Sequence, residues 1–320
     1  MKYIDVFNGD ADGICALIQL RLANPQNSTL ITGIKRDINL LRRVTAADGE
    51  HITTLDISFE KNALDVTRLL ESGATVDYFD HHKTGDLFKH ANLQTNINLA
   101  ADTCTSLIVD KYLNGQYRAW ALTAAFGDNL AETAMTLGVE SGFSEQQLLV
   151  LKQLGIYLNY NGYGASTDDL FFHPATLYEK LHQFKTPFEF LEQDQHTFET
   201  LAEGYQQDML SARQASVIYQ SETIAIIQFP DEIWARRVSG VFGNDLANLN
   251  PDRAHVVLTE KESGNYLVSV RAPLNRKFGA DELVSQFPTG GGRKAAAGIN
   301  DLPGTLVGQF IDACERQFSL

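Results

Sequence analysis

Short apolar runs alternate with amphipathic stretches along the first hundred residues. The stretches at 14–23 and 60–71 carry apolar residues at spacings of three and four, as helices that pack one face on a sheet do. The runs between them are rich in β-branched and aromatic residues, as buried strands are, and lie at 2–7, 29–34, 52–57, 76–80 and 95–99. This alternation predicts an α/β fold in which a parallel sheet carries helices on both faces.

From residue 105 onward the pattern is mostly helical, and strands return only after Ser221. The helices predicted in the middle of the chain lie at 105–113, 118–137, 144–158, 174–184 and 196–219. The later strands are predicted at 223–229, 254–260 and 265–271, with helices at 236–249, 280–286 and 308–317. The change of pattern predicts a first domain over 1–195, a helical linker over 196–220 and a smaller α/β domain over 221–320.

The composition is that of a globular protein, with 44% hydrophobic residues in a chain of 320. Lys and Arg number 26 against 40 Asp and Glu, which gives a formal net charge of -14. An acid excess of this size repels a polyphosphate backbone and argues against a protein that holds long DNA or RNA. The sequence has no run of about 18 apolar residues and begins directly with a predicted strand, so we expect a cytoplasmic protein that does not bind membranes. The three cysteines have neither disulfide nor zinc-site spacing.

Four acidic residues fall at the carboxyl ends of predicted strands. Asp10 and Asp12 lie in the turn after the first strand, Asp56 near the end of the third, and Asp80 at the end of the fourth, where two histidines follow. Ligands bind outside these ends in an open parallel sheet, so we expect the four side chains to share one pocket. Each of them alone is more often part of a solvated turn or a helix cap. Their coincidence at one edge of the sheet is what favours a site.

Carboxylate oxygens and imidazole nitrogens are ligands that suit Mn²⁺ or Mg²⁺. Grouped carboxylates repel one another unless cations neutralise them, so the cluster predicts bound metal ions. Two ions that share one carboxylate would form a centre able to clamp a phosphoryl group.

The order of these motifs resembles that of the DHH phosphoesterases that carry a C-terminal DHH-associated domain. The segment NGDADG at 8–13 is similar to the first motif of that family, Asp56 to the second, DHH at 80–82 to the third, and Asp128 in AFGDN to the fourth. Near the C-terminus, SVR at 269–271 and GGGRKAAAG at 290–298 resemble the S-x-R and GGGH-x-x-AAG signatures of the associated domain. The resemblance spans nearly the whole chain. It implies a catalytic DHH domain followed by a domain that binds substrate.

The resemblance also implies a centre of two divalent ions, Mn²⁺ by preference with Mg²⁺ or Co²⁺ as alternatives, that hydrolyses phosphoester or phosphoanhydride bonds. Asp56 would bridge the ions, His82 would face the phosphate as a donor or proton-transfer group, and Asp80 would orient a neighbouring imidazole. The implied metal ligands are Asn8, Asp10, Asp12, Asp56, His81 and Asp128. The implied substrate-binding residues are Arg271, Gly290, Gly291, Gly292 and Arg293.

Two residues depart from the pattern of the family. Asn8 stands where many members have a histidine and RecJ-type nucleases an aspartate, and its neutral oxygen would bind a metal ion more weakly. Arg293 replaces the histidine of GGGH, and its guanidinium could fork onto a phosphate or stack on a base. The three glycines before it could turn tightly and present N–H groups to an anion.

Other residues are second candidates for the site. Asp102 competes with Asp128 as the last metal ligand, and Asp128 is preferred because Asp102 could cap the helix predicted at 105–113. Three cations at the same edge of the sheet are interpreted first as surface charges, namely Lys35, Arg36 and Lys83. An aromatic and amide group would either line a base pocket or pack in the core, and comprises Tyr157, Asn159, Tyr160, Asn161 and Tyr163.

Together these features predict a Mn²⁺-dependent phosphodiesterase that hydrolyses short linear oligonucleotides or dinucleotides, of the pGpG or pApA type, to mononucleotides. Three alternatives stay open: a cyclic-dinucleotide phosphodiesterase, an adenosine-bisphosphate phosphatase, and a catalytically weak nucleotide- or RNA-binding protein. The last is motivated by Asn8 and Arg293. A homodimer is left open, and the sequence does not specify base preference.

Overall fold

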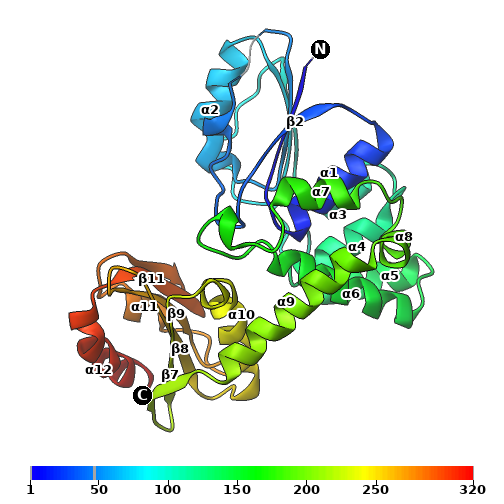
Figure 1. Cartoon of the computed structure of the whole chain (residues 1–320). Helices are drawn as coiled ribbons and strands as arrows, with labels where there is room; N and C mark the ends of the chain where they lie inside the picture. The colour runs from blue at the N-terminus through cyan, green and yellow to red at the C-terminus, as the bar shows by residue number, and fades with distance from the viewer. Residues whose placement is uncertain (1, 46–47, 320) are drawn as a thin grey trace. The chain divides into compact units, whose positions relative to one another are not determined.

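The computed structural model describes residues 2–45 and 48–319. The chain forms two compact units, Met1–Gly204 and Tyr205–Leu320, and the boundary between them falls within the long helix α9 (Gln195–Arg213) (Figure 1). Each unit has its own sheet and its own buried hydrophobic core. The two units are therefore described separately.

The first unit is built around a sheet of five strands in the order β2-β1-β3-β4-β5, in which all neighbours run parallel. The strands are β1 (Tyr3–Phe7), β2 (Ser28–Thr32), β3 (His51–Leu55), β4 (Thr75–Asp80) and β5 (Leu93–Ile97). Every strand predicted in this region is present, because short apolar runs are typical of strands that are covered on both faces.

Helices cover both faces of this sheet, as predicted. On one face lies α2 (Phe59–Glu71), whose Phe59, Val66 and Leu69 join a buried core with Tyr78. The opposite face carries α1 (Ala11–Ala23), α3 (Thr105–Tyr112) and α7 (Pro174–Leu181) (Figure 1). Because α1 follows β1 and α2 follows β3, the carboxyl ends of these strands are framed by helices on both sides.

A further helical layer completes the first unit and contains α4 (Arg118–Gly127), α5 (Ala131–Glu140), α6 (Glu145–Tyr160) and α8 (Pro187–Gln193). Trp120 of α4 is fully buried. α4 and α6 pack closely at Gly155, where a Cβ would lie 2.1 Å from the carbonyl oxygen of Thr123. The prediction of one helix over 118–137 is wrong, because the chain leaves the helix at residues 128–130. Asn129 has a φ of 63° there, a left-handed conformation that asparagine adopts more readily than most residues.

The second unit contains a sheet of six strands in the order β10-β11-β9-β8-β7-β6, in which only β7 and β8 pair in parallel. Its helices are α10 (Ile233–Leu249), α11 (Ala280–Val284) and α12 (Val307–Phe318). Its strands are β6 (Ser216–Gln220), β7 (Ile224–Phe229), β8 (Ala254–Glu260), β9 (Tyr266–Arg271), β10 (Gly290–Arg293) and β11 (Ala296–Leu302). The core gathers side chains from β7, β8, β9, β11 and α12, and the half-buried Trp234 of α10 lies with its ring centroid 5.1 Å from that of Phe229.

One predicted helix of this region is wrong at its end. The helix predicted over 196–219 stops at Arg213, and residues 216–220 form the edge strand β6 instead. The β-branched and aromatic side chains of this segment (SVIYQ) favour a strand, and pairing with β7 decides the outcome.

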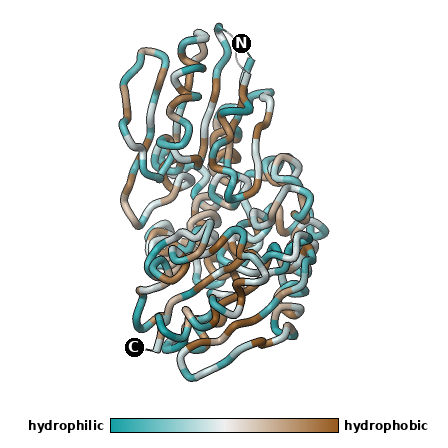
Figure 2. Tube along the Cα trace, turned by 90° about the vertical axis from the view of Figure 1, so that its left-hand side faces the viewer, coloured by the Kyte–Doolittle hydropathy of each residue, from teal (hydrophilic) through white to brown (hydrophobic). Residues whose placement is uncertain are grey.

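Hydrophobic and hydrophilic stretches alternate along the chain, as the colouring of Figure 2 shows. Among the residues that the structure describes, no helix is both long and apolar enough to cross a membrane.

Candidate metal centre

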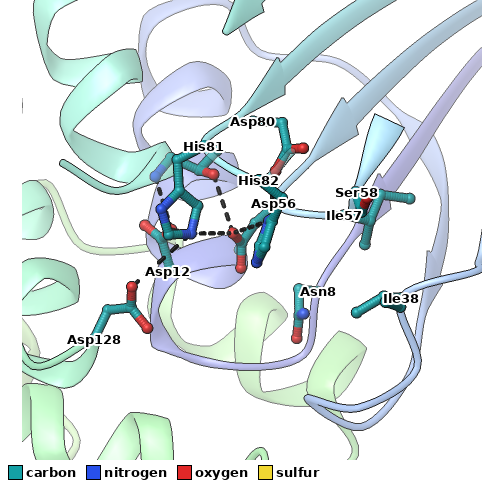
Figure 3. A network of polar contacts seen from close by, with 12 residues as sticks. Asn8, Asp12, Ile38, Asp56, Ile57, Ser58, Asp80, His81, His82 and Asp128 are labelled. Atoms are coloured by element: carbon teal, nitrogen blue, oxygen red, sulfur yellow. Dashed lines mark hydrogen bonds and ion pairs between the residues drawn. The ribbon is translucent and has the colours of Figure 1, made fainter. Parts of the chain in front are cut away.

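The acidic residues converge at the point in the first sheet where the chain continues from β1 to one side and from β3 to the other. β1 lies between β2 and β3, so the segments that follow β1 and β3 leave the sheet side by side at their carboxyl ends. Asp10 and Asp12 follow β1, Asp56 follows β3, and Asp80 is the last residue of β4. Asp128 reaches the same place from the C-terminal end of α4 (Figure 3).

His81 lies in the middle of the cluster, with its ring between Asp12 and Asp128 on one side and Asp56 on the other (Figure 3). Its Nδ1 donates to the carbonyl oxygen of Thr103 at 3.1 Å, which leaves the lone pair of Nε2 directed at the carboxylates. Nε2 lies 3.4 Å from Asp56 Oδ1 and 3.9 Å from one oxygen each of Asp12 and Asp128. This is the geometry of a histidine prepared as a metal ligand.

His82 has a different partner from His81. Its Nδ1 donates to Oδ1 of the fully buried Asp80 at 2.7 Å. Burial alone would lower the pKa of His82, but the hydrogen bond and negative charge of Asp80 outweigh it, so the pKa stands above its ordinary value. Asp80 therefore orients His82 and favours its protonated form.

Asp12 is fixed by the beginning of α3. Its two carboxylate oxygens accept the backbone N–H groups of Thr105 and Ser106, both at 2.7 Å, and the hydroxyl of Thr105 donates to Asp56 Oδ1 at 3.0 Å. These contacts were not predicted, because they join residues that are 49 to 94 positions apart in the chain. The expected cap for this helix, Asp102, is exposed and makes no such bond, so Asp12 is the carboxylate that caps α3.

Asp10 is held at the beginning of α1 and by a lysine. Oδ1 accepts the backbone N–H groups of Asp12 and Gly13 at 3.0 and 3.1 Å, and Oδ2 lies 2.5 Å from Nζ of Lys35. Burial raises the pKa of Asp10, but the charge of Lys35 and these hydrogen bonds outweigh it and leave the pKa below its ordinary value. Lys35 is a member of the site and not the surface charge that the sequence analysis assumed.

Lys35 contacts other groups of the cluster as well. Its Nζ lies 3.3 Å from Asp128 Oδ1 and 2.9 Å from Asn159 Oδ1, and 6.0 Å from the ring centroid of Tyr163. Burial alone would lower the pKa of Lys35, and the negative charges, Asp10 first, raise it well above its ordinary value. The ammonium is therefore a permanent positive charge within the site.

Asp56 occupies the most strained position of the cluster. Its φ of 58° lies in the left-handed region, which aspartate and asparagine adopt more readily than other non-glycine residues. Burial raises the pKa of Asp56 well above its ordinary value, and the charges of Asp12, Asp10 and Asp128 raise it further. A strained, buried carboxylate among like charges is unfavourable by itself, and a bound cation removes that penalty.

Asn8 carries an unused ligand atom. It is 3% exposed, and its Nδ2 donates to the carbonyl oxygen of Lys35 at 3.2 Å. Its Oδ1 is buried and has no hydrogen-bond partner among the described residues. An orphaned oxygen beside a cluster of carboxylates fits a cation-binding site.

The donor set therefore fits divalent metal ions with oxygen and nitrogen ligands, such as Mn²⁺ or Mg²⁺. Two groups of side chains bring ligand atoms within 4.8 Å of one another: Asp12, His81 and Asp128, and Asp56, His81 and His82. Asp128 is 22% exposed at its side chain and has a pKa that burial raises although Lys35 lowers it. The structure thus brings together five of the six predicted ligands, and places Asn8 at the same strand edge.

The residues predicted to bind substrate all belong to the second unit. Arg271 donates to Asn244 Oδ1, to Ser269 Oγ and to the carbonyl oxygen of Gly240 at 2.5, 3.0 and 2.9 Å. The glycines at 290–292 and the exposed Arg293 form the edge strand β10, which pairs with β11. The expected tight turn is therefore an edge strand, and positive φ values occur at Thr289 just before it (60°) and at Gly292 within it (149°).

The aromatic group divides between the two interpretations. Tyr157 and Tyr160 are buried in the core. The side-chain amide of Asn161 donates to the backbone carbonyl oxygen of Phe172 and accepts from its backbone N–H. Asn159 and Tyr163 instead face Lys35. The remaining two candidate cations, Arg36 and Lys83, are exposed.

No protein-family model matches the sequence, and no curated protein sequence is significantly similar to it. Solved structures share its fold. An exonuclease RecJ bound to manganese superposes with a TM-score of 0.62 at 16% identity, over 98% of this chain and 89% of the other. The pGpG-specific phosphodiesterase PggH from Vibrio cholerae gives a TM-score of 0.58 at 16% identity, over 99% of this chain and 98% of the other. A DHH domain from a member of a family of ribosomal proteins gives 0.61 at 13% identity, over 98% and 86%.

At such low sequence identities, the likeness to these structures shows a shared fold. The chain has the fold of the DHH phosphoesterases, with a parallel-sheet unit followed by a smaller α/β unit, and the predicted fold class is confirmed. The family resemblance drawn from the motifs is thereby supported independently of them.

Proposed function

We propose that this protein is a metal-dependent phosphodiesterase that hydrolyses short linear oligonucleotides or dinucleotides, of the pGpG or pApA type, to mononucleotides. The observation that carries the proposal is His81, whose Nε2 faces Asp12, Asp56 and Asp128 at the switch point of a DHH fold. Two solved structures with this fold support it: RecJ, an exonuclease bound to manganese, and PggH, a pGpG-specific phosphodiesterase.

The proposed centre takes two divalent ions, Mn²⁺ by preference. Asp12, His81 and Asp128 would hold one ion, Asn8 and Asp10 the other, and Asp56 would be shared. Bound ions supply Lewis acidity to the phosphoryl group and lower the pKa of the attacking water.

The remaining steps belong to side chains of the chain itself. His82, oriented by Asp80, would donate its Nε2 proton to the leaving sugar oxygen. The raised pKa of His82 supports this role, because it favours the protonated form of the ring. Lys35 would add positive charge beside the phosphoryl group.

A short substrate suits the net charge of the chain and a cavity beside the site. The net charge of -14 disfavours a long polyanion. A polar cavity of about 490 Å³ begins at Thr32–Ile34, next to Lys35 in the chain, and is lined by Arg36, by the ion pair of Arg43 and Asp37, and by the hydroxyl side chains of Ser166 and Thr167. Its volume matches the 300–1,000 Å³ of usual small-molecule sites. In the second unit, Arg271, Gly290, Gly291, Gly292 and Arg293 are the proposed contacts for the far end of the nucleotide.

The test is a substrate panel run with Mn²⁺, Mg²⁺ and Co²⁺. It contains linear pGpG and pApA, cyclic dinucleotides, adenosine bisphosphate, and RNA and DNA of increasing length, with the products followed by chromatography. We expect the linear dinucleotides to be cleaved fastest, and cleavage to be lost in His81→Ala and Asp128→Asn. The matched control is Asp102→Asn, which removes an exposed carboxylate near the site in sequence but outside the cluster. If no substrate is cleaved while nucleotides still bind, the protein is a binding module and the proposal fails.

A further inference from the structure

Lys35 is the one charged group of the centre to which the motifs assign no role. Its Nζ lies between Asp10 Oδ2 and Asp128 Oδ1, at 2.5 and 3.3 Å, and also contacts Asn159 Oδ1 at 2.9 Å. Two carboxylates and an amide oxygen thus form a site for a cation, and the ammonium of Lys35 is the cation that occupies it. The lysine side chain keeps 25% of its surface exposed, so it has room to leave.

The binding of one metal ion requires no change in the contacts of Lys35. His81 Nε2 and one oxygen each of Asp12 and Asp128 already lie within 4.8 Å of one another, and Asp128 uses a different oxygen for Lys35 than for His81. Nδ1 of His81 is committed to Thr103, so this ring can serve one ion only.

The second ion depends on Asp10, and both oxygens of Asp10 are engaged. Oδ1 accepts two backbone N–H groups at the beginning of α1, and Oδ2 is paired with Lys35. The other ligand on this side is Asn8, whose neutral oxygen attracts a divalent ion less strongly than a carboxylate does. An ion that approaches Asp10 Oδ2 must therefore displace the ammonium.

We propose that Lys35 competes with one of the two metal ions for Asp10 and Asp128, so that the ions of the centre bind with unequal affinity. The inference rests on the proposed metal centre but not on its substrate. The ring of Tyr163 already lies 6.0 Å from Nζ, and a movement toward it would give the displaced ammonium an aromatic face to contact. The long, flexible stem of lysine allows that movement.

The experiment is Mn²⁺ binding to the full chain after metal removal, measured by isothermal titration calorimetry for the wild type, Lys35→Met and Lys83→Met. Lys83 is an exposed lysine directly after His82, and it accepts a hydrogen bond from Ser58 through its backbone carbonyl oxygen. Lys83→Met thus removes the same charge at the same sheet edge without touching a ligand. We expect two classes of site in the wild type. Lys35→Met should tighten the weaker class by about tenfold or more, and Lys83→Met should change it by less than about threefold, since exposed charges are screened.

Equal or weaker Mn²⁺ binding by Lys35→Met would overturn the proposal, because Lys35 would then support the ligands and not compete for them. A wild type that binds no Mn²⁺ would overturn the proposed metal centre as well, which distinguishes the two failures. If Lys35→Met does not fold after metal removal, Lys35→Gln is the second variant, because its amide can still donate to Asp10. Lys35→Gln is loaded with Mn²⁺ and then dialysed. We expect it to retain two ions per chain, whereas the wild type retains one.

Discussion

The adjacent histidines of this protein differ in their surroundings, because each Nδ1 has a different hydrogen-bond partner. His81 donates to a backbone carbonyl oxygen and presents Nε2 to the carboxylates, whereas His82 donates to a buried carboxylate that stabilises its positive charge. Two residues that share one motif are therefore distinguished by their partners, Thr103 and Asp80. The partner of His82 also determines the pH dependence that we expect for the proposed reaction.

At the level of single residues, Asp80→Asn should lower the activity and move its pH profile. Asp80 raises the pKa of His82, so the protonated ring needed for proton donation is present below that pKa and is lost as the pH rises through it. Removing the charge of Asp80 lowers the pKa, and the alkaline decline should begin at lower pH. We expect kcat/KM to fall by about 10- to 100-fold, as for other residues that orient a catalytic or ligand histidine.

The measurement is kcat/KM for a linear dinucleotide from about pH 5 to 10 in saturating Mn²⁺, where the lower end lies below the ordinary pKa of histidine. His82→Gln serves as the reference, since it has no titrating group at this position. An alkaline limb at the same pH in Asp80→Asn and wild type would contradict the assignment of His82 as the proton donor.

At the level of elements, the beginning of α3 depends on a carboxylate from α1. Asp12 accepts two backbone N–H groups of α3, whereas Asp128 contacts Lys35 and His81 but, among the described residues, no helix N-terminus. Asp12→Asn replaces one accepting oxygen by an amide that cannot accept, so we expect a loss of about 1–2 kcal/mol in the free energy of unfolding. Asp128→Asn should lower the free energy of unfolding by less, because Asp128 lies at the C-terminal end of α4, where the helix dipole disfavours a negative charge.

Both variants remove one negative charge from the same cluster, so each of them relieves some repulsion between carboxylates. Urea unfolding followed by circular dichroism, in the presence of a chelator, measures the difference. Equal free energies of unfolding for the two variants would show that the α3 contact contributes nothing.

The elements of the fold were predicted well where the local sequence pattern determines the secondary structure. They were predicted poorly where contacts with distant residues determine it. The strands of the first sheet follow from short apolar runs. The end of α9 does not, since residues 216–220 become a strand only by pairing with β7. Likewise the motifs indicate Asp10, Asp12, Asp56, His81 and Asp128, but Lys35 and Thr105 join the site through contacts across 25 to 93 residues. Such contacts leave no periodic signal in a single sequence.

At the level of the whole molecule, the proposed metal ligands all lie in Met1–Gly204, and Tyr205–Leu320 has a separate core. We therefore expect Mn²⁺ to raise the unfolding temperature of the first unit only. A ligand at 100 times its Kd stabilises the state that binds it by about 2.7 kcal/mol. Differential scanning calorimetry with Mn²⁺ and with a chelator should show two transitions, one of which moves. Two transitions that both move, or neither, would contradict the prediction.

The two tryptophans of the chain fall one in each unit. Trp120 is fully buried in α4, the helix that ends at Asp128, and Trp234 is half-buried against Phe229 in the second unit. The molecule thus contains an intrinsic fluorophore for each half of its chain, and no label has to be attached. Replacing either indole by phenylalanine leaves a single emission signal, so that each half can be observed separately during unfolding and during titration with metal or nucleotide.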